Sequence, residues 1–119
     1  MTPDPPPIRG HIYLVGPAVP GVEPLPWLVI QHDVLNARAP TVVVAGLSPI
    51  AQRAAYPLTL RLQPADTGLT ATVWAKLTQI HTASRHRLGQ PLGRVAPARM
   101  VEMDQALAEI LALNRPADG

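Results

Sequence analysis

The sequence of 119 residues contains no cysteine and no phenylalanine. Without cysteine the chain has no disulfide, no cysteine-ligated zinc and no thiol nucleophile, a composition that fits a reducing cytoplasm. Without phenylalanine the core must be built from Val, Leu, Ile and Ala, together with two tryptophans. A chain of this length buries a little under ~70% of its unfolded surface, which is enough for one core.

Long apolar runs are also missing. No run approaches the roughly 20 residues that a membrane-spanning helix needs. The opening segment, MTPDPPPIRG, lacks the basic and apolar regions of a signal peptide, so no membrane association is expected. Its prolines indicate a flexible arm over residues 1–8, followed by a single domain over residues 9–115.

Acidic residues are scarce in the middle of the chain, where Asp66 is the only one between Val34 and Val101. Nine of the ten cationic residues are arginine, a side chain that binds phosphate through two hydrogen bonds at once. This balance favours a polyanionic partner such as nucleic acid. The alternative is that the arginines are scattered over a solvated surface and carry no such role.

The apolar pattern predicts a sheet of short strands. Alternation of apolar and polar residues indicates strands over 10–15, 58–63 and 69–77. Continuous apolar runs indicate central strands over 27–31 and 41–47. Further short strands are expected over 79–81 and 92–95, with a helical turn over 83–87 between them.

The C-terminal part of the sequence predicts one amphipathic helix. Pro97 suits a first helical turn, and Met100, Met103, Leu107 and Ile110 recur with the helical period. One face of this helix should therefore pack on the sheet. Short strands followed by one terminal helix predict a mostly β fold, either a small, strongly bent sheet or a barrel.

The segments RGHIYLV, LPWLVIQHDVLN, TVVVAGLS and QIHTASRHRLGQPLGRVAP, in this order, resemble the MazF/PemK family of toxins over residues 8–114. The resemblance implies a small SH3-like barrel that forms a homodimer and cuts single-stranded RNA without a metal. The ribose 2′-hydroxyl would attack the adjacent phosphate. A cognate antitoxin would lay a disordered acidic tail into the same groove, and DNA would be bound only through the toxin–antitoxin complex.

The resemblance also implies catalytic positions, with one departure. Glu23, in a long loop rich in glycine and proline, falls where many members have an acid, and it could act as the general base. Ser48 stands where the family has threonine, and Leu25 where it usually has arginine. Arg53 is the first candidate to replace that arginine. As alternatives, Glu23 is a solvated loop acid, Arg53 is an exposed loop charge, and Ser48 caps the turn before Pro49, which is the favoured reading for that serine.

Further residues are expected to bind RNA: Arg9, Tyr56, Gln79, His81, Arg85 and Arg87. Trp27 and Trp74 are expected to serve the core rather than to stack on bases, because the chain has no phenylalanine. His11 or His81 could act in place of the missing arginine. No histidine pair shows metal-ligand spacing near a carboxylate, so neither a metal nor another cofactor is expected.

The leucine at position 25 keeps a second class of function open. A barrel with weak or no catalytic activity could serve as a binding module for an antitoxin, for operator DNA or for another protein target. The fold by itself does not distinguish this module from a ribonuclease.

Overall fold

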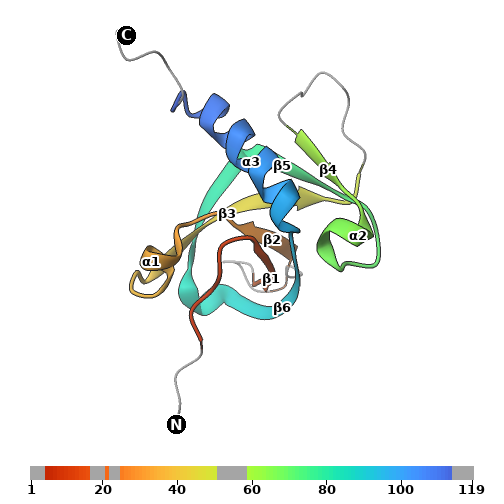
Figure 1. Ribbon diagram of the computed structural model, residues 1–119. Coiled ribbons are helices and arrows are strands. Elements are labelled where there is room, and N and C mark those ends of the chain that lie inside the picture. Colours follow the sequence, from red (N-terminus) through yellow and green to blue (C-terminus); the bar gives the residue numbers. More distant parts are fainter. Residues whose placement is uncertain (1–4, 17–20, 22–24, 51–58, 114–119) are drawn as a thin grey trace, which may run out of the picture.

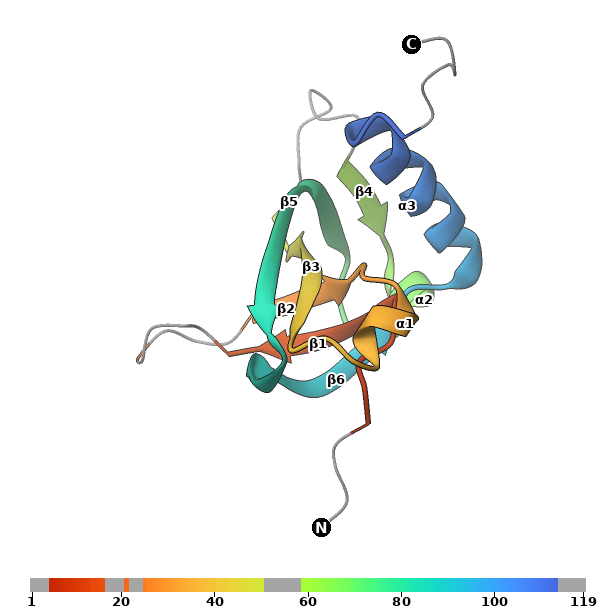
Figure 2. The same ribbon diagram turned by 90° about the vertical axis from the view of Figure 1, so that its left-hand side faces the viewer.

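Six antiparallel strands form one sheet, and a C-terminal helix lies along one side of it (Figures 1 and 2). The computed structural model describes residues 5–16, 21, 25–50 and 59–113. The strand order is β4-β5-β3-β2-β1-β6. The strands are β1 (His11–Val15), β2 (Leu25–Val29), β3 (Thr41–Ser48), β4 (Thr59–Leu62), β5 (Val73–Ser84) and β6 (Leu88–Arg94). The helices are α1 (Asp33–Asn36), α2 (Pro64–Thr67), the 3₁₀ turn η1 (Arg85–Arg87) and α3 (Pro97–Ile110).

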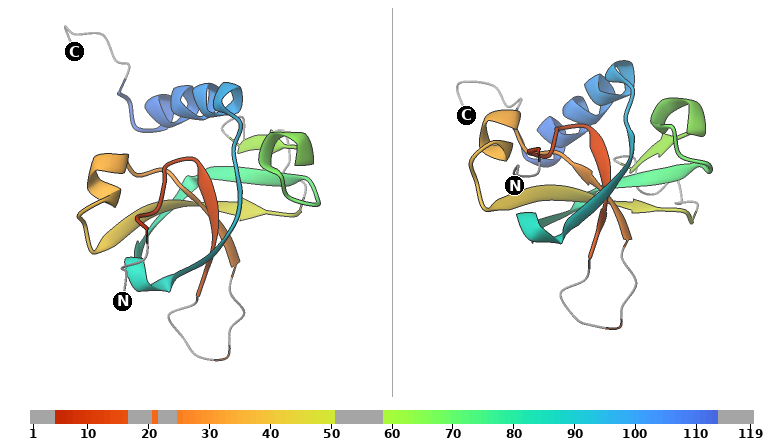
Figure 3. Two further views of the ribbon diagram at one scale, coloured as in Figure 1. Left: turned by 60° about the horizontal axis from the view of Figure 1, so that its bottom comes forward. Right: turned by 90° about the horizontal axis from the view of Figure 1, so that it is seen from below.

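Two apolar clusters lie on opposite faces of the sheet. The larger one includes Ile12, Leu28, Ala45 and Leu77 from the strands and Met103 from α3, all fully buried. This cluster fills the space between the strands and α3, which lies above them in Figure 3. The mostly β fold with a C-terminal helix is therefore confirmed.

The smaller cluster lies on the other face and fixes which side chains point away from α3. Its buried members are Val29, Val42 and Val44, and Tyr13, Trp27 and Leu88 pack against them. Because strand residues alternate between faces, residues that share parity with Val44 on β3 also point away from α3.

The sheet does not close into a barrel, which corrects the expected SH3-like closure. The edge strands β4 and β6 stand at opposite ends of the strand order, and no described residues pair them.

Helix α2 lies against β6 at one edge. A β-carbon added at Gly93 would come within 2.3 Å of the Thr67 carbonyl oxygen, and the Ala96 N–H donates to the Asp66 carbonyl at 2.7 Å.

Strand β5 is one continuous strand where two strands, over 69–77 and 79–81, were expected. Ala45 pairs with Ile80, yet the next residue, Gly46, pairs with Lys76, so residues 77–79 form a bulge. A bulge bends its strand and re-aims side chains. The expected helical turn appears as η1, and β6 begins at Leu88 rather than at residue 92.

The polar segment after β2 joins two strands through a buried network. The Gln31 amide donates to Asn36 Oδ1 at 2.9 Å and to the Thr41 carbonyl at 3.1 Å. The Asn36 amide donates to the Gln31 carbonyl at 2.9 Å, and the Val43 N–H donates to Gln31 Oε1 at 3.2 Å. The polar side chains of Gln31 and Asn36 thus form hydrogen bonds with buried backbone groups in the connection between β2 and β3.

The proposed arm over residues 1–8 is described only from Pro5 onward. Pro7 is buried, and the Ile8 N–H lies 3.3 Å from the Tyr13 hydroxyl. Among the described residues, no helix has the length and apolar character needed to cross a bilayer.

Candidate nucleic-acid interface

The strand register gathers polar and aromatic side chains on the side of the sheet that faces away from α3. Trp27, Gly46, Lys76 and Thr59 stand side by side on four neighbouring strands. A second row, two residues further along the strands β3, β5 and β4, consists of Ser48, Trp74 and Arg61. We call this surface the outer face; it consists of Trp27, Gly46, Ser48, Thr59, Arg61, Trp74, Lys76, Gln79 and His81.

Alternation on β5 explains why Trp74 and Lys76 point to this side. Val73, Ala75 and Leu77 belong to the cluster beneath α3, so the residues between them must point the other way. Lys76 was not among the residues expected to bind RNA, although the alternation in VWAKL predicts that its side chain lies on this face.

Gly46 allows two side chains to meet over the backbone of β3. A β-carbon added there would lie 3.3 Å from Gln79 Oε1 and 3.6 Å from Trp27 Cζ3. The rings of Trp27 and His81 meet edge to face, with centroids 4.8 Å apart. Two of the expected RNA-binding residues, Gln79 and His81, are thus brought together beside an indole ring.

Neither tryptophan is fully buried. Trp27 packs against the smaller cluster but keeps part of its ring exposed, and Trp74 is likewise half-buried. The core role expected for Trp27 is therefore only partial, and Trp74 belongs to neither apolar cluster. Both rings share the outer face with Lys76, where an indole can stack on a base.

The Ser48 hydroxyl is engaged in a local turn. Its Oγ accepts from the Ile50 N–H at 3.1 Å, across Pro49. This geometry is that of a serine turn, which agrees with the capping alternative. Leu25 begins β2 opposite Val15, and its side chain is 56% exposed. The other two catalytic candidates, Glu23 and Arg53, lie outside the described residues, as does Tyr56.

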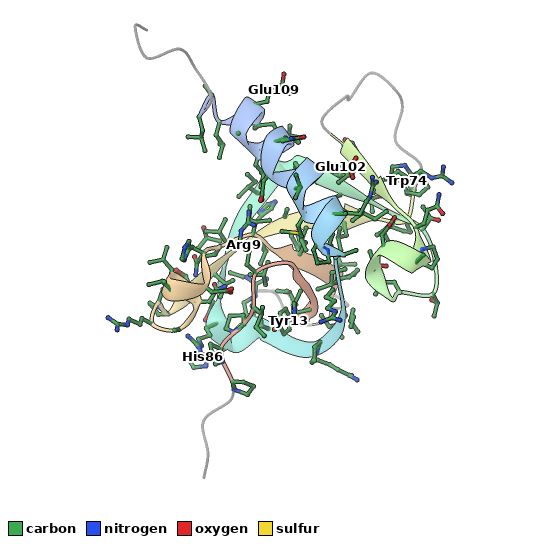
Figure 4. All side chains as sticks on the ribbon, viewed as in Figure 1. Arg9, Tyr13, Trp74, His86, Glu102 and Glu109 are labelled. Carbon is green, nitrogen blue, oxygen red and sulfur yellow. The ribbon has the colours of Figure 1, made fainter. Side chains whose placement is uncertain are left out.

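The arginines expected to bind RNA are engaged elsewhere. Arg9 lies between the sheet and α3 (Figure 4), where its Nη2 pairs with Asp104 at 2.7 Å and its Nε donates to the Ile30 carbonyl at 2.8 Å. Arg85 Nη1 donates to the Asn36 carbonyl at 2.6 Å. Arg87 Nε donates to the Gly16 carbonyl at 2.6 Å, at the end of β1.

The described strands carry no acidic residue. Every acidic residue that the structure describes lies on a helix: Asp33, Asp66, Glu102, Asp104 and Glu109. The strands carry Arg61, Lys76 and Arg94 instead. Within the described ranges the outer face therefore has cations and no carboxylate, as binding of a polyanion requires.

His11 lies apart from His81. It pairs with Arg94 on β6, and its ring stacks on that of Tyr13 with centroids 6.5 Å apart. His81 pairs with Val44 and contacts Trp27. Of these two histidines, His81 is the one beside Gln79 and Gly46.

Comparisons with known proteins indicate the family of this chain. A family model described as "PemK-like, MazF-like toxin of type II toxin-antitoxin system" matches residues 8–111. The endoribonuclease MazF of Staphylococcus epidermidis is 31% identical over 112 residues, which cover 89% of this chain and 92% of that protein.

Two solved structures share the fold. An endoribonuclease from a mycobacterial species is 28% identical, with a TM-score of 0.76 over 94% of this chain and 97% of that one. A mycobacterial endoribonuclease in complex with its cognate antitoxin is 30% identical, with a TM-score of 0.77 over 92% and 99%. Because the family model spans most of the sequence and the fold agrees, this chain belongs to the PemK-like, MazF-like family of type II toxin–antitoxin toxins.

Proposed function

We propose that this toxin is an endoribonuclease that cuts single-stranded RNA in the cytoplasm without a metal. The observation that carries the proposal is the outer face, where Trp27, Trp74, Lys76, Gln79 and His81 share one surface on which no described residue is acidic. Indole rings stack on unpaired bases and the cation attracts phosphate, so an unpaired strand fits this surface better than a duplex. The naming of its relatives as endoribonucleases supports the same activity.

The proposed reaction is a transesterification. The ribose 2′-oxygen forms a bond to phosphorus, the bond from phosphorus to the 5′-oxygen breaks, and the 5′-oxygen takes up a proton. The products are a 2′,3′-cyclic phosphate and a 5′-hydroxyl. Glu23 would accept the 2′-hydroxyl proton, Ser48 would donate a hydrogen bond to a phosphate oxygen, and Arg53 would offset the developing negative charge.

The purified protein is expected to cut a mixed-sequence RNA in the presence of EDTA. The ends should be 2′,3′-cyclic phosphate and 5′-hydroxyl, which sequencing of the fragments with end-specific ligation identifies. Intact RNA at micromolar protein, with or without added Mg²⁺, would contradict the proposal.

Removing one preorganised group that stabilises the transition state should slow cleavage by ~10²–10³-fold. Glu23→Gln and Arg53→Ala test this, with the exposed Arg38→Ala as the charge-matched control.

We further propose a homodimer whose outer faces bind an antitoxin with a disordered acidic tail. The tail would compete with RNA for the same cations, because both ligands are anionic. A relative of this chain has been solved with its cognate antitoxin. Light scattering of the toxin alone tests the dimer, and RNA cleavage titrated with an acidic antitoxin tail tests the competition. DNA would be bound only by the toxin–antitoxin complex.

One observation favours a second function, a binding module without catalysis. The exposed Leu25 supplies no charge at the position where the family usually has arginine. RNA binding without scission, or toxicity that persists in Glu23→Gln, would support this alternative.

A further inference from the structure

We propose that Lys76 is a phosphate-binding cation of the outer face and acts together with the proposed Arg53 to supply the charge that this chain lacks at Leu25. The inference rests on the proposed ribonuclease function and assigns one residue within it. Lys76 is the only lysine in the sequence. It lies in the middle of the sheet on β5, between β3 and β4.

The residues paired with Lys76 on the two neighbouring strands are small. Gly46 on β3 has no side chain, although Gln79 and Trp27 lie over it, and Thr59 on β4 has a short side chain. Beyond Gly46 stands Trp27, and two residues before Lys76 on the same face stands Trp74. A strand crossing between the two rings would therefore carry its backbone over the lysine while its bases stack on either side.

Lys76 is also placed to act together with Ser48. The serine is two residues beyond Gly46 on β3, which makes it the diagonal neighbour of Lys76 across the strand pair. Diagonal neighbours lie roughly 7–8 Å apart, and a lysine ammonium stands at the end of a flexible four-carbon stem. One phosphate can thus receive the ammonium from one strand and the hydroxyl from the other.

Among the described residues, Lys76 has no partner for its charge. The ion pairs among the described residues join Arg9 to Asp104, and Arg99 to Asp66 and Glu102. Lys76 takes part in none of these, and within the same ranges it makes no side-chain hydrogen bond, whereas Arg9, Arg85 and Arg87 donate to fixed acceptors. A half-buried cation that has no partner in the described part of the chain favours an incoming anion.

The test compares single-turnover cleavage by the wild-type protein with that by Lys76→Met and Lys76→Arg. Methionine keeps the apolar stem but removes the charge, so the fold should be retained, and thermal unfolding checks this. Cleavage should fall by ~10²–10³-fold in Lys76→Met and recover at least tenfold in Lys76→Arg. Arg38→Gln, which loses the same charge just after α1, is the control and should match the wild type.

A second measurement separates phosphate contact from a structural role. RNA affinity is measured against salt concentration in the Glu23→Gln background, which should bind without cutting. The slope of log affinity against log salt should be smaller by ~0.7 in Lys76→Met, which corresponds to one phosphate contact on a single strand. An unchanged slope, or an unchanged cleavage rate in folded Lys76→Met, would overturn the assignment. If the wild-type protein does not cut RNA, the proposed ribonuclease function is wrong. The salt dependence of RNA binding then still tests Lys76 separately, because an unchanged slope would show that this lysine does not contact phosphate.

Discussion

At the scale of single residues, Arg9 was expected to bind RNA because of its charge, but its hydrogen bonds stabilise the fold. Its backbone N–H donates to Asp33 Oδ1 at 2.7 Å, while its guanidinium joins Ile30, the residue after β2, to Asp104 on α3. The N–H of Arg9 is the main reason why the pKa of Asp33 lies below its ordinary value of 3.8; desolvation opposes it, and the Asn36 amide adds to the lowering. Arg9 therefore holds the start of β1 against two helices.

The lowered pKa of Asp33 predicts a pH-dependent contribution to stability. The charged carboxylate stabilises the fold above the unfolded pKa, near 3.8, and this contribution is lost as the pH falls through the lower pKa of the folded state. Asp33→Asn should thus unfold more easily than the wild type at pH 7, by on the order of 1 kcal/mol or less because the group is exposed. Urea titrations at pH 7 and pH 3 measure the difference, which should shrink at pH 3. Glu109→Gln, without an ion pair among the described residues, should show no such difference at either pH.

At the scale of elements, α2 and β6 are held so close that only glycine fits between them. A β-carbon at Gly93 would meet the Thr67 carbonyl oxygen at 2.3 Å, which is backbone and cannot swing away. At Gly16, by contrast, the nearest atom is the Arg87 carbonyl oxygen at 3.7 Å, an ordinary contact.

Gly93→Ala should therefore destabilise the protein by about 1–3 kcal/mol, because α2 must move away from β6. Gly16→Ala should change the free energy of unfolding much less. Chemical denaturation of both variants checks this difference. Equal losses would mean that α2 does not hold the edge of β6.

At the scale of the whole molecule, the outer face carries Arg61 and Lys76 and no described acid, whereas α3 carries three acids on the other side of the sheet. The net charge of the sequence is only +2, so overall charge is too small to explain strong RNA binding. Figure 4 shows Glu102 and Glu109 on α3, while Trp74 marks the strand that carries Lys76. RNA binding should therefore depend on where a charge lies rather than on the total.

A pair of charge reversals tests this distribution. Arg61→Glu, on the outer face, should weaken RNA binding at least tenfold and flatten its salt dependence. Glu109→Lys raises the net charge by the same amount that Arg61→Glu lowers it, yet on the opposite side, and it should leave affinity within about twofold. Filter binding over a range of salt concentrations measures both. Tighter binding by Glu109→Lys would mean that net charge alone governs the interaction.

The sequence by itself determined the first four strands and the terminal helix, because the burial of alternate residues and the helical period of Met103 and Leu107 are local patterns. It did not determine that β5 is continuous or that β6 begins at Leu88. It also supplied the family through the order of its segments. It could not decide whether the sheet closes, since that depends on whether the edge strands β4 and β6 pair with each other. Closure of a sheet is a contact between residues far apart in the chain.

For the candidate site too, some residues could be identified from the sequence, while their neighbours are known only from the structure. Gln79 and His81 were identified from the sequence, but only the register shift at Gly46 brings Gln79 over Trp27 and sets Lys76 beside them. Arg9, Arg85 and Arg87 were selected for their charge, and only the tertiary structure supplied the carbonyl and carboxylate groups that hold them. Alternation fixes the face that a side chain takes within its own strand. Its neighbours across the sheet, and the acceptors it meets, depend on how distant segments pack.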